Sequence, residues 1–117
     1  MQREVTVVVG GKAEQVAADH LVRQGYEIVG RNWRRRECEI DIVARKAGVV
    51  YFVEVKYRST DIVGSGLEYI GPQKLKQMAY AAWRWVAENR WDGEYTLAAI
   101  EISGASYEVT AFIDSIY

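Results

Sequence analysis

The chain has few of the residues that bind soft metals or cross-link small folds. Its 117 residues include one cysteine, Cys38, one histidine, His20, and one proline. A single cysteine excludes an internal disulfide, and two soft ligands are too few for a structural zinc site. Any bound metal must therefore be a hard cation held by oxygen atoms. A chain of this length buries about two thirds of its unfolded surface, so we expect one domain over residues 1–117.

Long apolar runs and a large excess of one charge are also missing. The run from Val5 to Val9, interrupted by Thr6, is too short for a membrane span or a signal-peptide core. We expect residues 1–11 to be a tail or an extra strand, and the protein to be cytoplasmic with no membrane partner. Fifteen basic against sixteen acidic residues give a net charge of −1, which argues against an unselective polybasic nucleic-acid binder.

The charge is nevertheless uneven along the chain. Residues 1–60 carry 11 basic and 8 acidic side chains, a net of +3, whereas residues 61–117 carry 4 and 8, a net of −4. The densest basic cluster is Arg31-Asn32-Trp33-Arg34-Arg35-Arg36. Arginines beside one tryptophan suit phosphate contacts with one stacking side chain. A solvated loop or an edge strand kept soluble by its charge explains the same cluster equally well.

The apolar periodicity predicts an α/β fold with the order α-β-β-β-α-β-β. The expected elements are a helix over 12–24 closed by Gly25, strands over 26–33, 39–46 and 49–58, a helix from Pro72 to about Asn89, and strands over 95–103 and 107–113. The short turn at Ala47-Gly48 predicts a hairpin. The connection through the second helix is long enough for a parallel crossover, so we expect a central mixed sheet flanked by helices.

Acidic side chains and one lysine gather on this predicted hairpin. Strand alternation places Glu39 and Asp41 on one face, opposite Ile40, Ile42 and Ala44, and places Glu54 beside Lys56 on the next strand. A near-ideal register makes Asp41 and Glu54 cross-strand neighbours. Two adjacent carboxylates repel unless a cation lies between them, and Mg²⁺ or Mn²⁺ takes such ligands.

Lys56 would stand beside that cation. There it could orient or deprotonate an attacking water, or stabilise the charge that develops on a phosphate. Glu14, on the inward face of the first helix, either joins the site or favours the helix dipole from a near-terminal position. The plain alternative is an exposed cross-strand ion pair on the hairpin, worth about 0–1 kcal/mol. With Glu14 and Glu39 nearby, we favour the metal site.

The stretch from Gly10 to Lys74 also resembles a known family. The resemblance rests on Gly10, Glu14, Gly25-Tyr26 and Lys74, and on the segments RNWR over 31–34, EIDIVA over 39–44 and FVEVKYR over 52–58. These are similar to the YraN-like family of small predicted endonucleases, related to archaeal Holliday-junction resolvases in the PD-(D/E)xK nuclease superfamily. The chain departs from the family pattern at Ala13 and Cys38, where glycines are expected, and its second helix carries fewer basic residues.

The resemblance implies a restriction-endonuclease-like core with Glu14, Asp41 and Glu54 as metal-site acids and Lys56 as the catalytic lysine. We therefore predict a Mg²⁺- or Mn²⁺-dependent endonuclease that hydrolyses DNA, including branched or single-stranded DNA, and acts as a homodimer. Glu39 is a supporting acid, and the expected nucleic-acid contacts are Arg31, Arg34, Arg35, Arg36, Arg58 and Lys74. The alternative is a non-catalytic nucleic-acid-binding module of the same fold. The tryptophans of the second helix region are candidate interface residues: Trp83, Trp85 and Trp91.

Overall fold

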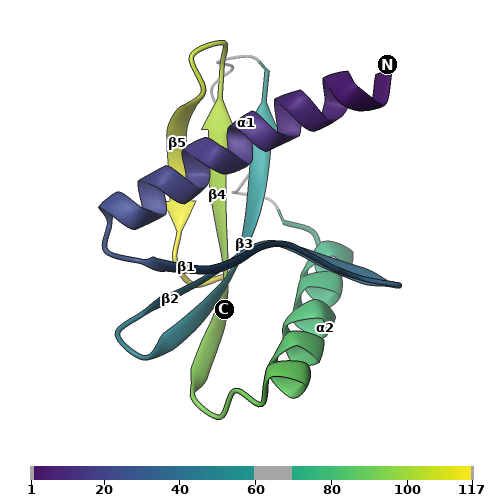
Figure 1. Ribbon diagram of the computed structural model, residues 1–117, viewed down its shortest axis with the longest axis vertical. Helices are drawn as coiled ribbons and strands as arrows, with labels where there is room; N and C mark the ends of the chain where they lie inside the picture. The colour runs from purple at the N-terminus through teal and green to yellow at the C-terminus, as the bar shows by residue number, and fades with distance from the viewer. Residues whose placement is uncertain (1, 60–69, 117) are drawn as a thin grey trace.

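A five-stranded sheet with one helix on each face forms the molecule (Figure 1). The computed structural model describes residues 2–59 and 70–116, with side chains described from residue 11. The elements are α1 (Gln2–Arg23), β1 (Glu27–Arg35), β2 (Cys38–Lys46), β3 (Val49–Arg58), α2 (Pro72–Asn89), β4 (Glu94–Ser103) and β5 (Glu108–Ile113). The predicted order α-β-β-β-α-β-β is confirmed. Most of the connection between β3 and α2, residues 60–69, lies outside the described residues.

The strands lie side by side in the order in which they occur in the chain, from β1 to β5. Three of the four pairings are antiparallel, and β3 with β4 is parallel because α2 carries the chain back across the sheet. The predicted mixed sheet is thus confirmed. Ala47 and Gly48 have φ of 51° and 79° and join Lys46 to its partner Val49. Two left-handed residues make the twisted two-residue turn that favours a hairpin.

Helix α1 is longer than its sequence suggests. It begins at Gln2, so residues 2–11 are neither a tail nor an extra strand, which corrects that expectation. A helix bonds its own backbone groups, whereas an added strand would need a free sheet edge as partner. The helix ends at Arg23, and Gly25 follows with φ +94°. The Tyr26 N–H then donates to the Leu21 carbonyl at 2.9 Å, as expected for a glycine-terminated helix.

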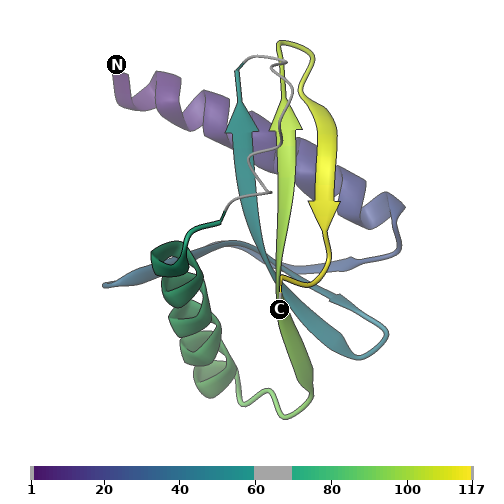
Figure 2. The ribbon, with the colours of Figure 1, turned by 180° about the vertical axis from the view of Figure 1, so that it is seen from behind.

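The two helices cover opposite faces of the sheet, as Figures 1 and 2 show from the two sides. Under α1, the buried core includes Leu21, Ile42, Val53, Ile100 and Ile102. Under α2, it includes Phe52, Leu97, Met78, Ala82 and Trp85. Neither of the described helices has an apolar stretch long enough to cross a membrane.

Strands β2 and β3 separate part-way along their length. Their pairing runs from Lys46 opposite Val49 to Ile42 opposite Val53, although β2 reaches back to Cys38 and β3 continues to Arg58. Beyond this point β2 stays with β1 and the pair diverges from β3 (Figure 1). Ile40 consequently packs on the α2 side while Ile42 and Ala44 pack under α1. The expectation that these three share one face is wrong, because β2 twists where it leaves β3.

Candidate functional site

The place where β2 and β3 separate, beyond the pair Ile42–Val53, is called the fork, and it brings Asp41 and Glu54 together. Asp41 is the β2 residue just beyond the last paired position, and Glu54 holds the same place on β3. Both line one small recess with Phe52 and Met78. An Asp41 carboxylate oxygen, Oδ2, accepts the backbone N–H of Val55 at 2.9 Å. The side chain thus satisfies an N–H donor at the point where the strand pairing ends.

Burial and a neighbouring acid make Asp41 reluctant to ionise. Its pKa is raised from 3.8 to about 6, first by burial and then by the charge of Glu54, with a smaller contribution from Glu39. The Val55 N–H and Lys74 act in the opposite direction. Carboxylates that disfavour each other's charge in this way are stabilised by a bound cation. The fork is therefore electrostatically suited to one.

Lys74 is the cation that the structure places beside Glu54. It lies in the first turn of α2, and its Nζ is 3.2 Å from Glu54 Oε2. The Glu54 side chain is only 17% exposed, so this ammonium is its main described counter-charge. Lys74 was expected to contact nucleic acid. The structure instead makes it part of the wall of the carboxylate site, where it is also available to a phosphate once Glu54 has another partner.

Glu14 faces the fork from α1. Its pKa is raised, first by burial and next by the charge of Asp41, while Arg31 and a hydrogen bond from Asn32 lower it. Its Oε1 atom is buried and accepts no hydrogen bond from any described residue, and the Arg31 guanidinium is 3.8 Å away. A buried carboxylate oxygen without a donor is costly. Glu14 thus behaves as an outlying third acid, coupled to Asp41 by charge.

The donor set fits a hard divalent cation in type, and only partly in arrangement. Asp41 and Glu54 supply the one or two carboxylates that Mg²⁺ usually takes, with water and substrate oxygens completing its shell. The orphaned Glu14 oxygen adds a further acceptor near them. Among the side chains that the structure describes, however, no three acidic, histidine or cysteine groups lie close enough to share one ion. The described side chains of Glu14, Asp41 and Glu54 therefore do not converge on one point, as a shared ion would require.

Glu39 lines the edge of the recess, and its carboxylate pairs with an arginine of β1. It lies opposite Arg34 in the β1–β2 pairing, and Arg34 Nη1 donates to Glu39 Oε2 at 2.6 Å. Both side chains are more than half exposed. Glu39 therefore acts on Asp41 only as a nearby charge.

Lys56 lies two residues beyond Glu54 on β3, so both side chains point to the α2 face of the sheet. It is partly buried and forms no ion pair with any residue in the described part of the chain. Its register partner on β4 is Glu101. Glu54 and Lys56 therefore share one face of β3, and Asp41 meets Glu54 at the recess where β2 and β3 separate.

Glu101 is an acid that the sequence reading missed. It is 4% exposed in the middle of β4, its Oε1 accepts the Thr110 hydroxyl at 2.8 Å, and its Oε2 is 3.7 Å from Arg58 Nε. An acid within the otherwise apolar run Leu97–Ile102 was the available signal. Arg58, expected at a phosphate, is thus held by this buried carboxylate beside Lys56.

The predicted basic contacts mostly have acidic partners within the protein. Besides Arg58 and Lys74, these are Arg31 with Glu14, Arg34 with Glu39, and Arg35 with Glu88. Arg36, in the β1–β2 turn, forms no ion pair with a described residue. Strand β1 is an edge strand of the sheet, so the arginines from Arg31 to Arg35 lie along that edge. Exposed ion pairs are worth about 0–1 kcal/mol, so they exchange readily for a phosphate.

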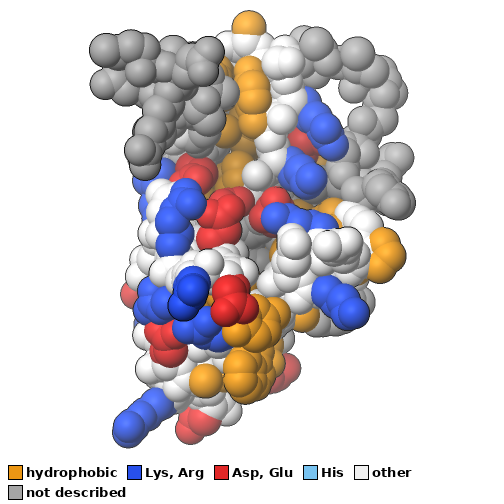
Figure 3. Space-filling model, turned by 90° about the vertical axis from the view of Figure 1, so that its right-hand side faces the viewer, with side chains coloured by type: hydrophobic (Ala, Val, Ile, Leu, Met, Phe, Trp, Pro, Cys, Tyr) orange, Lys and Arg blue, Asp and Glu red, His pale blue; other side chains and the backbone are white. Residues whose placement is uncertain are grey.

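A polar groove of about 330 Å³ separates the β1–β2 hairpin from α2. Its lining includes Arg34, Arg35, Arg36, Lys74 and Gln77. Figure 3 shows acidic side chains near the middle of this side of the molecule, with basic side chains around them. The groove shares Glu39 and Met78 with the Asp41–Glu54 recess. A polyanion in the groove would therefore adjoin the carboxylate pair.

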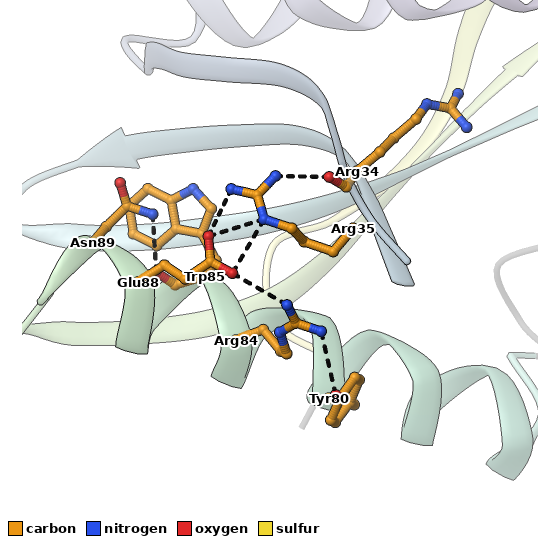
Figure 4. Close-up of polar contacts among 7 residues, drawn as sticks. All are labelled: Arg34, Arg35, Tyr80, Arg84, Trp85, Glu88 and Asn89. Atoms are coloured by element: carbon orange, nitrogen blue, oxygen red, sulfur yellow. Dashed lines mark hydrogen bonds and ion pairs between the residues drawn. The ribbon is translucent and has the colours of Figure 1, made fainter. Parts of the chain in front are cut away.

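One arginine joins the two walls of the groove. Arg35 makes hydrogen bonds to both Glu88 oxygens on α2 at 2.6–3.1 Å (Figure 4). Its guanidinium also stacks over the Trp33 ring, 4.4 Å from the ring centroid. The hydrogen bond from Arg35 is the main reason that the pKa of Glu88 is lowered. Trp33, expected as a stacking residue for a base, already has the guanidinium on one face. The hairpin is thereby fastened to the helix.

Comparison with known proteins identifies the family. A model described as "Uncharacterised protein family UPF0102" matches residues 13–103. The chain belongs to UPF0102. This confirms the resemblance to the YraN-like family at the level of the family. The matched segment contains the candidate site residues Glu14, Asp41, Glu54, Lys56 and Lys74.

The UPF0102 relatives come from several bacteria. A protein of Leifsonia xyli is 45% identical over 76 residues, which is 65% of this chain and 64% of that protein. One of Mycolicibacterium smegmatis is 39% identical over 97 residues, or 81% and 77% of the two chains. One of Flavobacterium johnsoniae is 31% identical over 114 residues, or 92% and 93%. Each carries only the UPF0102 description.

The tryptophans of this UPF0102 chain differ in exposure. Trp85 is buried against Phe52, with the ring centroids 5.5 Å apart, and Trp91 packs partly on the same core. Trp83 is 59% exposed. Of the three candidate interface residues, only Trp83 presents most of its surface.

Proposed function

We propose that this UPF0102 protein hydrolyses phosphodiester bonds in DNA, branched or single-stranded DNA included, with Mg²⁺ or Mn²⁺ held at Asp41 and Glu54. The observation that carries the proposal is the partly buried Asp41 carboxylate beside Glu54. The Asp41 pKa of about 6 reflects burial and the repulsion that a cation would relieve. Such a site at the end of a basic groove suits a phosphate polymer.

Each residue has a role in this proposal. A bound cation would supply the positive charge that polarises the phosphate and lowers the pKa of water. Asp41 and Glu54 would hold it, with Glu14 and Glu39 as supporting negative charge. Lys56 either orients and deprotonates the attacking water or stabilises the charge that builds on the phosphate. The water loses a proton as its oxygen bonds to phosphorus, the bond from phosphorus to the leaving sugar oxygen breaks, and that oxygen takes up a proton from solvent.

In this proposal, Lys74 exchanges its Glu54 partner for a substrate phosphate when a cation binds. Its ammonium neutralises Glu54 at 3.2 Å. A divalent cation on Glu54 would take over that function, and the Lys74 side chain, 36% exposed, would be available to a substrate phosphate. The nucleic-acid role expected for Lys74 is compatible with its ion pair for this reason.

A non-catalytic nucleic-acid-binding protein of the same fold is the second candidate. It is favoured by one observation, namely that no three metal-binding side chains meet among the described residues. Such a protein would bind DNA through the groove arginines in a salt-sensitive way. It would do so with no dependence on Asp41.

The test is cleavage of supercoiled, single-stranded and four-way-junction DNA by purified protein with Mg²⁺ or Mn²⁺, beside Asp41→Ala and a chelator control. We expect cleavage of at least one substrate, its loss with chelator, and a fall of at least about 100-fold in Asp41→Ala, since the variant lacks a ligand. Unchanged cleavage by Asp41→Ala would refute the assignment. DNA binding without cleavage by either protein would favour the second candidate.

A further inference from the structure

The outer face of α2 carries two exposed aromatic side chains that the proposed reaction does not use. Tyr80 is 40% exposed and Trp83 is 59% exposed, although large aromatic side chains usually bury most of their surface. Their ring centroids are 6.1 Å apart and the ring planes differ by 30°. The rings therefore touch without stacking on each other, which leaves flat apolar surface open to a ligand.

A second groove runs from Tyr80 along the start of α2. It has a volume of about 590 Å³ and is lined by Glu37, Pro72, Gln73, Lys76, Gln77 and Tyr80. It shares Glu37 and Gln77 with the polar groove below the β1–β2 hairpin. The two grooves thus adjoin at Glu37 and Gln77. They connect the surroundings of the Asp41–Glu54 recess with the exposed aromatic pair.

The side chains along this path suit a phosphate backbone with bases attached. Arg36 and Lys76 are exposed cations in the turn and on the helix, and neither forms an ion pair with a residue that the structure describes. The amides of Gln73 and Gln77 offer donors and acceptors between them. Arg84 Nη1 lies 3.5 Å from the Tyr80 hydroxyl, and its Nη2 contacts Glu88 (Figure 4). The Arg84 Cζ atom lies over one face of the Tyr80 ring, 6.0 Å from its centroid, which leaves the other face for a base.

Exposed aromatic rings of this kind suit unpaired bases. In a duplex, neighbouring base pairs cover both faces of each base, so an aromatic side chain on a protein surface can stack only on an unpaired or terminal base. Stacking of this kind tolerates any base, because every base has a flat π face. A protein partner fits less well, since the amides of Gln73 and Gln77 and the ammonium of Lys76 line the approach to the aromatic pair.

We propose that the groove along α2 binds a single-stranded segment of the substrate, with a base stacked on Tyr80 or Trp83 and its phosphates near Arg36 and Lys76. The inference rests on the proposed function for the identity of the polymer. It narrows the substrate class to DNA that has an unpaired stretch beside the cleavage position.

The experiment measures binding without cleavage. Fluorescence anisotropy with labelled oligothymidylate of about 12 nucleotides, within the span of known single-strand sites, is compared with a blunt hairpin duplex, both with chelator present. Wild type, Tyr80→Leu and Trp83→Leu are measured. Tyr95→Leu is the matched control, because Tyr95 is 44% exposed on β4, outside both grooves. Thermal unfolding checks that each variant is folded.

We expect Tyr80→Leu and Trp83→Leu to weaken oligothymidylate binding by roughly 5- to 100-fold and duplex binding little, with no change for Tyr95→Leu. Equal oligothymidylate affinity in all four proteins would overturn the inference. So would a shift from dimer to monomer in light scattering for Trp83→Leu with DNA affinity unchanged, which would make this face an interface between copies. If binding depends on the aromatic pair but no DNA is cleaved, only the proposed function fails.

Discussion

Replacing Asp41 by asparagine is expected to stabilise the folded protein at about pH 8. The Asp41 pKa is raised from 3.8 to about 6, so the folded state holds this proton more tightly than the unfolded chain does. The contribution of protonated Asp41 to the free energy of unfolding is therefore fully present below about pH 4, and it is lost as the pH rises through about 6. A pKa shift of about two units corresponds to a loss of at most about 3 kcal/mol in the free energy of unfolding. Asparagine keeps an acceptor for the Val55 N–H and removes the charge.

Urea unfolding with chelator at about pH 4 and about pH 8 measures this effect. We expect Asp41→Asn to gain roughly 1–3 kcal/mol over wild type at the higher pH and almost nothing at the lower. Asp19→Asn is the control, because Asp19 is exposed on α1 and accepts a hydrogen bond from the exposed Gln15 side chain. An Asp41→Asn protein less stable than wild type at the higher pH would contradict the account of a strained carboxylate pair.

Replacing Lys56 by methionine is expected to lower the rate of DNA cleavage by about 100- to 10,000-fold, the range for loss of a general base or of one charge-stabilising group. Methionine keeps most of the aliphatic length, and Lys56 forms no ion pair with a described residue that its removal would break. Stability and DNA affinity should therefore change little. The measurement is single-turnover cleavage with saturating Mn²⁺.

Lys46→Met is the matched control for this experiment. Lys46 is on the same hairpin but five residues from Asp41 along β2, about 16 Å at the rise of a strand. It donates to the Gln24 carbonyl and has no contact with the fork. Cleavage by Lys56→Met at the wild-type rate would remove Lys56 from the mechanism.

Local sequence signals predicted the parts of the fold that local physics determines. Pro72 and the apolar spacing of α2 placed that helix at 72–89, and Ala47-Gly48 placed the hairpin turn. Gly25 marked the end of α1 because a positive φ is costly for other residues. The start of α1 at Gln2 was missed, since valines and paired glycines are weak helix formers and argue against a helix there.

The candidate site was predictable in its residue types more than in its geometry. Alternation placed Glu54 and Lys56 on one face, and the hairpin register placed Asp41 beside Glu54. The divergence of β2 from β3, which turned Ile40 to the other layer, depends on how the whole sheet twists. The partners of Arg35, Arg58 and Lys74 lie on α2, β4 and β3, and such long-range contacts leave no mark on local sequence.

The central claim is that Asp41 and Glu54 hold a divalent cation, and calorimetric titration of Mn²⁺ into wild type and Asp41→Asn at about pH 7.5 tests it most directly. The account predicts saturable binding near one ion per chain in wild type, weakened at least about tenfold in Asp41→Asn by the loss of one of two carboxylate ligands. Saturable binding of equal affinity in both proteins, or no binding to wild type at millimolar Mn²⁺, would contradict it.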